Sequence, residues 1–378
     1  MSDVHGLVDP RFEGVRATLA ASLARGDDIG ASFAATLNGE PIIDIWGGWA
    51  DAEQTRPWQR DTIVNVYSTT KTMCALTALW LADQGALKFE EKVAHYWPEF
   101  AQAGKADVTV AQLMSHSAGL SGFVRPMQRH EIYDWDLACS TLAAQAPYWE
   151  PGTAAGYHGL TQGFLVGEVV RRISGKSLGT LFAEELAGPL GADFHIGLAA
   201  EHDARVADLV PPPGGASITA GPQSDLAKNM GGNPPIDPLE TRTRAWRAAE
   251  LPAANGHGNA RSVVAVQTLV ANGGVAGGKR LLSEAGVRRA LELQIDTPAD
   301  LVLGMPVRYG LGYGLPGPLR PFPSPNSVFW GGYGGSLVVC DMDLKLCMSF
   351  VMNKMAATTM GDMRAGMLLA GVWGALLS

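Results

Sequence analysis

The sequence predicts an α/β protein of the α+β type. An antiparallel sheet flanked by helices is built from both chain termini, and a mostly helical domain is inserted between them. Strand-like segments cluster near the two termini, whereas helical patterns joined by Gly- and Pro-rich connections fill the middle. A chain of 378 residues also has the length of roughly two to three domains. We therefore expect residues 1–86 and 255–378 to form one α/β domain and residues 87–254 to form the helical insert.

The N-terminal segment predicts a helix followed by a β-hairpin. Residues 10–25 place apolar side chains on one face at helical spacing. These apolar residues are Phe12, Val15, Leu19 and Leu23. Two strand-like segments follow, Ala31–Leu37 and Pro41–Trp46, and the Asn38-Gly39 pair between them is a strong signal for a tight hairpin turn.

The rest of the chain predicts further helices and the other half of the sheet. A long apolar segment that ends at Gly85 indicates a helix beginning near Ser68. The later expected helices are Leu160–Ile173, Val263–Ala271, Ser283 to about Gln294, and a packed terminal segment, Met367–Leu377. The later expected strands are Val307–Leu315, Ser336–Cys340 and Leu346–Val351.

The composition, with 47% hydrophobic and 17% charged residues, is that of a soluble globular protein. A net charge of −8 without any basic cluster argues against nucleic-acid binding. No stretch reaches the ~18 apolar residues of a membrane span, and the N-terminus lacks the features of a secretory signal. We therefore expect a cytoplasmic protein.

The four cysteines show no metal-ligand spacing, so we expect buried free thiols, which fit a reducing compartment. They are Cys74, Cys139, Cys340 and Cys347. The sequence contains neither an HExxH metal motif nor paired carboxylates. We expect no metal and no cofactor, and the sequence does not specify an oligomeric state.

The run Ser68-Thr69-Thr70-Lys71 places a nucleophile and a candidate base within one helical turn. Residues three apart share a helix face, so the Ser68 hydroxyl and the Lys71 amine can meet. The amine can take the serine proton only if burial or nearby positive charge lowers its pKa. The helix N-terminus also supplies N–H groups that suit a developing oxyanion. On spacing alone, a capping serine and a solvated lysine remain the alternative.

Tyr157 is the best candidate for a second proton-handling group. It lies in a Gly-rich loop, from Pro151 to Gly159, directly before a predicted helix. Next to a buried ammonium, a phenol can lose its proton well below its usual pKa of ~10. The alternative is an interface tyrosine that packs its ring and hydrogen-bonds its hydroxyl.

A second Gly-rich segment, Trp330-Gly331-Gly332-Tyr333-Gly334-Gly335-Ser336, leads into the expected strand that ends at Cys340. Glycine within a strand often marks the close approach of a ligand or another backbone. An N–H group on this edge could complete an oxyanion hole with the N–H of Ser68. A bulged strand with a tight turn is the alternative.

Together these segments resemble the three ordered motifs of the serine β-lactamase and penicillin-binding-protein superfamily. The motifs here are Ser68-x-x-Lys71, Tyr157 after Pro-Gly-Thr, and Trp330-Gly331-Gly332. The chain most resembles the class C β-lactamase-like branch and, within it, the family VIII carboxylesterases. The segment Leu113–Leu120 is similar to that branch's LLSHTSGL segment, and the resemblance extends from about residue 10 to the end.

The resemblance implies roles for individual residues. Ser68 would be the acylated nucleophile, and Lys71 and Tyr157 would share the proton transfers. The backbone N–H groups of Ser68 and Tyr333 would form the oxyanion hole. The expected substrate contacts are Trp330, Gly331, Gly332 and His158, and for His158, beside Tyr157, tuning of the site or a surface or structural role are the alternatives.

Two departures from the family pattern bear on the substrate. The second motif is usually Tyr-x-Asn, but here it is Tyr157-His158-Gly159, so a side-chain amide is missing. The third is usually Lys-Thr-Gly or His-x-Gly, and here a tryptophan, Trp330, replaces a group that could pair with a substrate carboxylate. Both departures point toward neutral, partly apolar esters.

A serine–histidine hydrolase would need a Gly-x-Ser-x-Gly elbow. The nearest match, Ser115-His116-Ser117-Ala118-Gly119, begins with serine, so the motif fails and His116 is expected to be structural. His257 lies in a Gly-rich loop and gives no clear functional signal.

We therefore expect a serine hydrolase that cleaves short- to medium-chain, neutral carboxylic esters through an acyl-enzyme on Ser68. The alternatives are a β-lactamase or D-amino-acid peptidase of the same superfamily, an acyltransferase and, from a different class, a non-catalytic binding protein. The expected partner is a small-molecule ester, with neither nucleic acid nor membrane involved.

Overall fold

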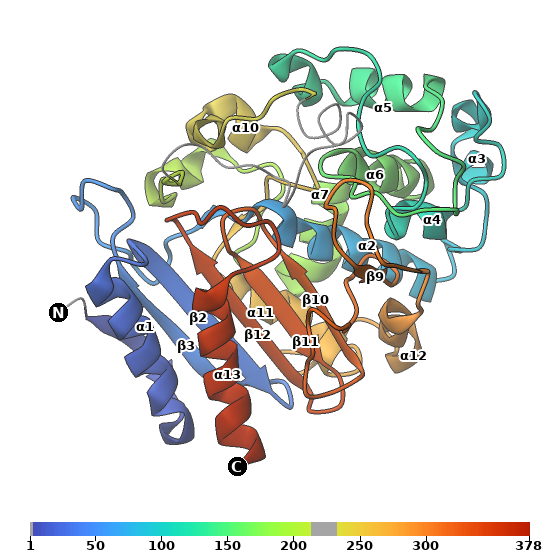
Figure 1. Cartoon of the computed structure of the whole chain (residues 1–378). Coiled ribbons are helices and arrows are strands. Elements are labelled where there is room, and N and C mark those ends of the chain that lie inside the picture. Colours follow the sequence, from blue (N-terminus) through green and yellow to red (C-terminus); the bar gives the residue numbers. More distant parts are fainter. Residues whose placement is uncertain (1–2, 213–232) are drawn as a thin grey trace.

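The computed structural model of the protein describes residues 3–212 and 233–378, and residues 213–232 of the predicted insert lie outside this part. A six-stranded antiparallel sheet forms its centre and takes strands from both ends of the chain (Figure 1). In spatial order the strands are β1 (Val4–Val8), β3 (Glu40–Gly48), β2 (Gly30–Leu37), β12 (Leu346–Met352), β11 (Leu337–Asp341) and β10 (Ser327–Gly331). The predicted fold class is confirmed.

The two ends of the chain meet where β2 pairs with β12. The register runs from Leu346 opposite Leu37 to Met352 opposite Ala31. Both strands are buried along almost their whole length, which explains why their sequences are apolar runs rather than alternating patterns. The Asn38-Gly39 hairpin joins β2 to β3 as predicted, with φ of 53° and 85° at its two central residues.

Helices cover both faces of this sheet. On one face, α1 (Glu13–Arg25) and α13 (Met363–Leu377) lie side by side, and on the other α11 (Ala260–Ala271) packs across β2 and β12 (Figure 1). The predicted N-terminal and C-terminal helices are therefore confirmed. The side chain of Asp362 caps α13 by accepting from the Arg364 N–H, so this helix begins earlier than the apolar run indicated.

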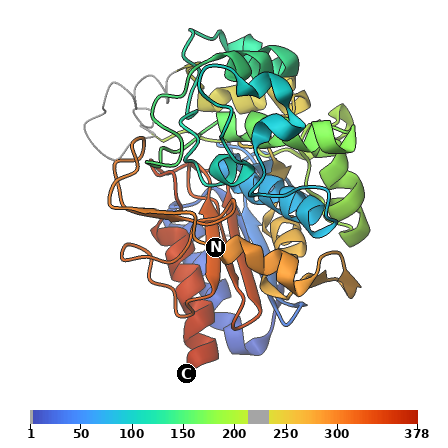
Figure 2. The same ribbon diagram turned by 90° about the vertical axis from the view of Figure 1, so that its right-hand side faces the viewer.

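The remaining helices of the described chain lie mostly beyond one end of the sheet, as Figure 2 shows. They are α2 (Thr70–Asp83), α3 (Val93–Tyr96), α4 (Val110–Met114), α5 (Trp135–Ala144), α6 (Thr161–Ser174), α7 (Leu178–Phe182), α8 (Gly188–Leu190), α10 (Arg244–Ala248) and α12 (Glu284–Arg288). Most come from the predicted insert. The proposed domain boundaries themselves remain a prediction.

Two predicted elements are shorter than expected. The strand expected over Val307–Leu315 is only β9 (Val307–Tyr309), which pairs with β8 (Ile295–Thr297). It ends because the N–H of Gly310 bonds to the carbonyl of Tyr313 in a tight turn, in which Gly312 has φ of 82°. The helix expected from Ser283 stops at Arg288 and continues only as a 3₁₀ turn.

Strands β1 and β10 were not predicted. The short antiparallel pairs β4 (Val64–Asn65) with β5 (His257–Gly258) and β6 (Val275–Ala276) with β7 (Lys279–Arg280) also gave no sequence signal. Strand β10 contains Trp330 and Gly331, so the Gly-rich segment starts inside the sheet and leaves it after Gly331.

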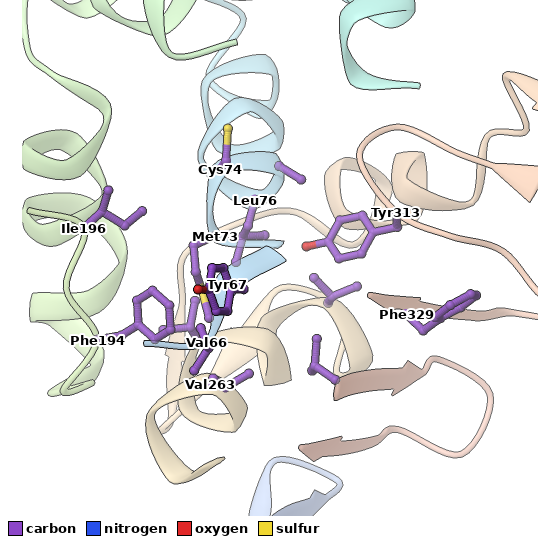
Figure 3. Close-up of a cluster of buried hydrophobic side chains, with 14 of the residues drawn as sticks. Val66, Tyr67, Met73, Cys74, Leu76, Phe194, Ile196, Val263, Tyr313 and Phe329 are labelled. Atoms are coloured by element: carbon purple, nitrogen blue, oxygen red, sulfur yellow. The ribbon is translucent and has the colours of Figure 1, made fainter. Parts of the chain in front are cut away.

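The start of α2 packs against a buried apolar cluster, shown in Figure 3. Val66 and Tyr67 lie just before the helix and Met73 lies on its first turns, with Phe194 on one side and Phe329 on the other. This packing fixes the position of the residue at the helix start. The four cysteines are all buried and free, as expected.

Candidate active site

Ser68 lies in a 3₁₀ turn, Tyr67–Thr69, that leads directly into α2. The preceding residue, Tyr67, has φ of 44°, a left-handed conformation that costs energy for a residue with a side chain. The strained backbone therefore turns sharply just where the candidate nucleophile is presented. Ser68 also lines a cavity, so a substrate can reach its hydroxyl.

Lys71 lies one turn further along, as the spacing predicted, and only 1% of it is exposed. Its Nζ lies 3.2 Å from Ser68 Oγ and donates to the carbonyls of Gly159 at 2.7 Å and Ala253 at 2.9 Å. No carboxylate of the described chain pairs with it. Burial lowers the pKa of the Lys71 amine to about 7, so much of the population is neutral near neutral pH.

Tyr157 reaches the same serine from the other side. Its Oη donates to Ser68 Oγ at 2.5 Å, and its ring centre lies 4.9 Å from the Nζ of Lys71. Burial raises the pKa of the Tyr157 phenol to about 12, opposite to the decrease expected beside an ammonium. The main cause is the burial of the Tyr157 hydroxyl itself, which disfavours the phenolate. Tyr157 is therefore a protonated hydroxyl that donates.

The loop that carries Tyr157 is held by a residue that the sequence analysis missed. Asp300 Oδ1 accepts the backbone N–H of Tyr157 at 3.0 Å, and also the N–H groups of Val302 and Leu303. Its Oδ2 accepts the hydroxyl of Tyr309 at 3.2 Å. Burial raises the pKa of the Asp300 carboxyl. A single aspartate in a loop belongs to no distinctive motif, so this role could not be predicted from the sequence.

His158 is also part of this support. Its Nδ1 donates to the Gly156 carbonyl at 2.6 Å and its Nε2 accepts from the N–H of Leu120 at 3.1 Å. Its backbone N–H donates to His116 Nδ1 at 3.0 Å. Burial lowers the pKa of His158 to about 3, so the ring is neutral. It is fully buried and does not line the cavity, so the structure places His158 in the structural role that was the alternative to a substrate contact.

The expected oxyanion donors lie on two different elements. The N–H groups of Ser68 and Tyr333 form no hydrogen bond with any described residue, and both residues line the same cavity. Ser336 fastens the two elements together, since its Oγ donates to the Val66 carbonyl at 2.9 Å and lies 2.9 Å from Thr69 Oγ1. Two free donors at a cavity edge suit an oxyanion.

Gly332 allows this close approach. A Cβ at Gly332 would lie 2.2 Å from the Val66 carbonyl oxygen and 2.2 Å from Ser336 Oγ. The position cannot take a side chain unless the turn and the nucleophile segment move apart. Gly331 and Gly332 therefore act as spacing residues and do not line the cavity themselves.

Trp330 is not a wall of the cavity either. It is 1% exposed and packs behind the site, with its ring 5.3 Å from His116, 5.6 Å from Tyr309 and 6.1 Å from Tyr157. The expected substrate contact is thus a buried support for Tyr157. In this chain the third motif supplies packing behind Tyr157.

The cavity in front of Ser68 is small, about 90 Å³. Its aromatic walls are Tyr67, Trp246 and Tyr333, and its aliphatic walls include Leu160, Ile236 and Val302. No described residue that lines it has a charged side chain. A small, uncharged cavity favours a compact, neutral group beside the nucleophile.

The described residues also bear on metal binding and on membrane insertion. No group of three or more His, Cys, Asp or Glu side chains is arranged to hold a metal ion. Among the described helices, none has both the length and the apolar character that crossing a bilayer requires.

Comparison with known proteins gives consistent matches along the chain. The Beta-lactamase family model matches residues 15–371. Esterase/beta-lactamase LipL of Mycobacterium tuberculosis is 34% identical over 96% of this chain and 86% of its own length. Among solved structures, a family VIII carboxylesterase is 42% identical, with a TM-score of 0.93 over 99% of this chain and all of the other. A penicillin-binding protein homologue from Caulobacter crescentus is 35% identical, with a TM-score of 0.92 over 99% and 100%.

Proposed function

This chain is a serine hydrolase of the β-lactamase family, and from that premise we propose that it is a carboxylesterase that acts on short-chain, neutral esters through an acyl-enzyme on Ser68. The observation that carries the proposal is the convergence of Lys71 Nζ and Tyr157 Oη on Ser68 Oγ, at 3.2 and 2.5 Å. Both the family match and this geometry support it.

The hydrogen bonds of Lys71 indicate which group is the base. A neutral amine has two N–H bonds and one lone pair. The carbonyls of Gly159 and Ala253 accept both N–H bonds, which leaves the lone pair directed at Ser68 Oγ. With a pKa of about 7, Lys71 can take the serine proton in neutral solution.

In the acylation step, Ser68 Oγ attacks the ester carbonyl carbon and its proton passes to Lys71. The carbonyl oxygen becomes an oxyanion, which the N–H groups of Ser68 and Tyr333 stabilise. The intermediate then collapses, breaking the bond to the alkoxide. Tyr157, protonated and adjacent to Ser68, gives its proton to the leaving oxygen and regains one from Lys71.

Deacylation reverses these roles. A water molecule gives a proton to the Tyr157–Lys71 pair as its oxygen attacks the acyl carbon. The second intermediate collapses, the acid leaves and Ser68 recovers its proton. Each proton is returned by the end of the cycle, so the reaction needs no proton donor or acceptor outside the site.

The cavity supports the choice of substrate. A volume of about 90 Å³ is small compared with the ~300–1,000 Å³ of typical ligand sites, which favours a short acyl group. A β-lactam or a peptide C-terminus carries a carboxylate that needs a cationic partner, and the described walls contain none. We therefore place amide-cleaving activity second, although LipL is named both esterase and beta-lactamase.

The test is a panel of p-nitrophenyl esters from acetate to dodecanoate, run beside nitrocefin. We expect the highest kcat/KM for the short esters and little nitrocefin hydrolysis. Ser68→Ala should abolish turnover and labelling by a fluorophosphonate while keeping the wild-type melting temperature. Faster hydrolysis of nitrocefin than of any ester would contradict the proposed substrate class. Full ester turnover by Ser68→Ala would contradict the mechanism.

A further inference from the structure

A second, larger cavity lies next to the active site but is separate from it. Its volume is about 370 Å³, within the ~300–1,000 Å³ range of small-molecule sites. None of the described residues that line it also lines the cavity in front of Ser68. Tyr309 and Phe329 belong to its walls, and both adjoin Trp330, Phe329 in sequence and Tyr309 through ring packing at 5.6 Å.

The walls of this second cavity are largely apolar. They include Met305, Leu315, Leu319, Phe329 and Met360. Leu319 is 58% exposed, so its side chain adds apolar surface that is open to water. A hydrocarbon or aryl group placed here would cover apolar surface that water now contacts.

Positive charge in the cavity exceeds negative charge. Arg308 is compensated, since its Nε lies 3.0 Å from Asp296 Oδ2 and its Nη1 donates to the Pro316 carbonyl at 2.6 Å. Arg320 is not: its guanidinium makes no hydrogen bond or ion pair with any described residue. Within the described part of the chain, its guanidinium lies near the Phe329 ring, whose centre is 5.1 Å away.

Arg320 is half-buried, and burial lowers its pKa, so the surroundings disfavour the charged form without any counter-ion. A guanidinium presents five N–H donors in a planar fork that matches a carboxylate with two parallel hydrogen bonds. The contact of Arg320 with the Phe329 ring, at 5.1 Å from Cζ to the ring centre, restricts the side chain, so less freedom is lost when an anion binds.

We propose that this cavity is a binding site for a small carboxylate with an apolar body, whose carboxylate pairs with Arg320 and whose apolar part lies against Met305, Leu315 and Met360. Such a ligand would contact Tyr309 and Phe329, the two wall residues that adjoin Trp330, and would therefore lie behind the residues that support Tyr157. The inference does not depend on the proposed reaction, because it requires no turnover at Ser68.

The probe is octanoate, with octanamide as a neutral control of nearly the same shape. Two methionines line the cavity, so their ¹³C-labelled methyl groups report binding locally in NMR spectra. Met305→Leu and Met360→Leu assign the two signals. We expect octanoate to shift both signals with saturation, and octanamide to bind about tenfold more weakly.

Arg320→Gln is the deciding variant, and Arg288→Gln is its matched control. Arg288 lies on a different surface depression, so its replacement removes the same charge elsewhere. We expect octanoate affinity to fall about tenfold in Arg320→Gln and to stay within about twofold in Arg288→Gln. Ester turnover should be unchanged in both variants. The NMR signals of the methionines outside the cavity should also be unchanged.

If Arg320→Gln does not fold, Arg320→Lys keeps the charge but loses the planar fork, and should weaken octanoate binding by a smaller factor. Equal binding of octanoate and octanamide would overturn the proposal. Undiminished octanoate binding by Arg320→Gln would also overturn it, as would octanoate shifts confined to methionines outside the cavity. A failed ester assay would bear only on the function of Ser68.

Discussion

The backbone N–H of Tyr157 donates to Asp300 Oδ1 at 3.0 Å, across 143 residues of sequence. The same oxygen accepts two further N–H groups from the loop that follows Asp300. One buried carboxylate thus joins the loop that carries the Tyr157 phenol to a loop that supplies Val302 to the cavity wall. The position of Tyr157 Oη relative to Ser68 depends on this link.

Replacing Asp300 should therefore reduce catalysis without touching the reacting atoms. In Asp300→Ala three buried N–H groups lose their acceptor, and we expect kcat to fall at least about tenfold and the protein to lose about 2–3 kcal/mol of stability. Asp300→Asn keeps the acceptor oxygen, so this variant should have most of the wild-type activity. Ester kinetics and urea unfolding measure the two effects. Equal losses in both variants would show that the charge, rather than the hydrogen bonds, matters.

The pH dependence of kcat/KM should follow the Lys71 amine. Lys71 must be neutral to accept the serine proton, and its pKa is about 7, so activity should rise with pH through that value. The Tyr157 phenol, with a pKa of about 12, should stay protonated up to about pH 10, giving a plateau. The low pKa of His158 excludes it as the source of the acidic limb. A profile that falls between about pH 6 and 8 would contradict Lys71 as the base.

Lys71 should also make stability depend on pH. The unfolded chain holds this proton up to the usual lysine pKa of 10.5, whereas the folded chain releases it near pH 7. Between these values the unfolded state binds more protons, so the free energy of unfolding should increase with pH by at most ~1.4 kcal/mol per pH unit.

Lys71→Met removes this titration along with nearly all activity. We compare the free energy of unfolding of the wild type with that of Lys71→Met. The wild-type value minus the variant value should increase steadily as the pH rises from about 7 to about 10. Urea unfolding at several pH values measures the difference, in which the other titrating groups cancel. A constant difference would mean that Lys71 is charged in the folded protein.

Gly332 should tolerate no side chain. In Gly332→Ala the new Cβ would lie 2.2 Å from the Val66 carbonyl oxygen, so the turn bearing the Tyr333 N–H must move away from Ser68. Losing one oxyanion donor typically costs about 100-fold or more in kcat. Gly374→Ala, on an open face of α13 with no atom within 4 Å, is the control and should be neutral or slightly stabilising. Wild-type kcat in Gly332→Ala would remove Tyr333 from the proposed hole.

Trp330→Lys should not create a β-lactamase, although it would restore a lysine to the third motif. Position 330 is 1% exposed and enclosed by the rings of His116, Tyr157 and Tyr309, so an ammonium there would be buried without a partner. We expect a lower melting temperature, weaker ester hydrolysis and no gain with nitrocefin. A gain in nitrocefin hydrolysis would show that this position can reach the substrate.

Much of the fold could be predicted, because its elements have strong local signals. The hairpin at Asn38-Gly39 needs φ > 0 at both central positions, and helix α6 has a clear apolar periodicity. The stretch Val307–Leu315 misled because buried apolar residues look like a strand even when two glycines fold the backbone into a turn. Strand β10 was hidden by its own glycine motif.

The candidate active site could be predicted from the sequence only in part, because several of its contacts join residues far apart in the chain. The spacing of Ser68 and Lys71 is local and survives into the structure, whereas the depth at which Lys71 is buried depends on Gly159 and Ala253, far away in sequence. The burial of Tyr157 itself also depends on distant contacts, and it makes the direction of the Tyr157 pKa shift opposite to the expected one. It likewise takes distant contacts to show that His158 and Trp330 support the site from behind. Asp300 has no sequence signal at all.

The bond from Ser336 Oγ to the Val66 carbonyl joins residues 270 positions apart. A ribosome therefore releases the nucleophile segment long before the turn that carries the second proposed oxyanion donor. Until β10 and β11 pair within the sheet, a partly made chain has Ser68 and Lys71 but lacks the Tyr333 N–H beside them. Ester turnover would begin only after these strands have paired, so its onset would report when this part of the sheet forms.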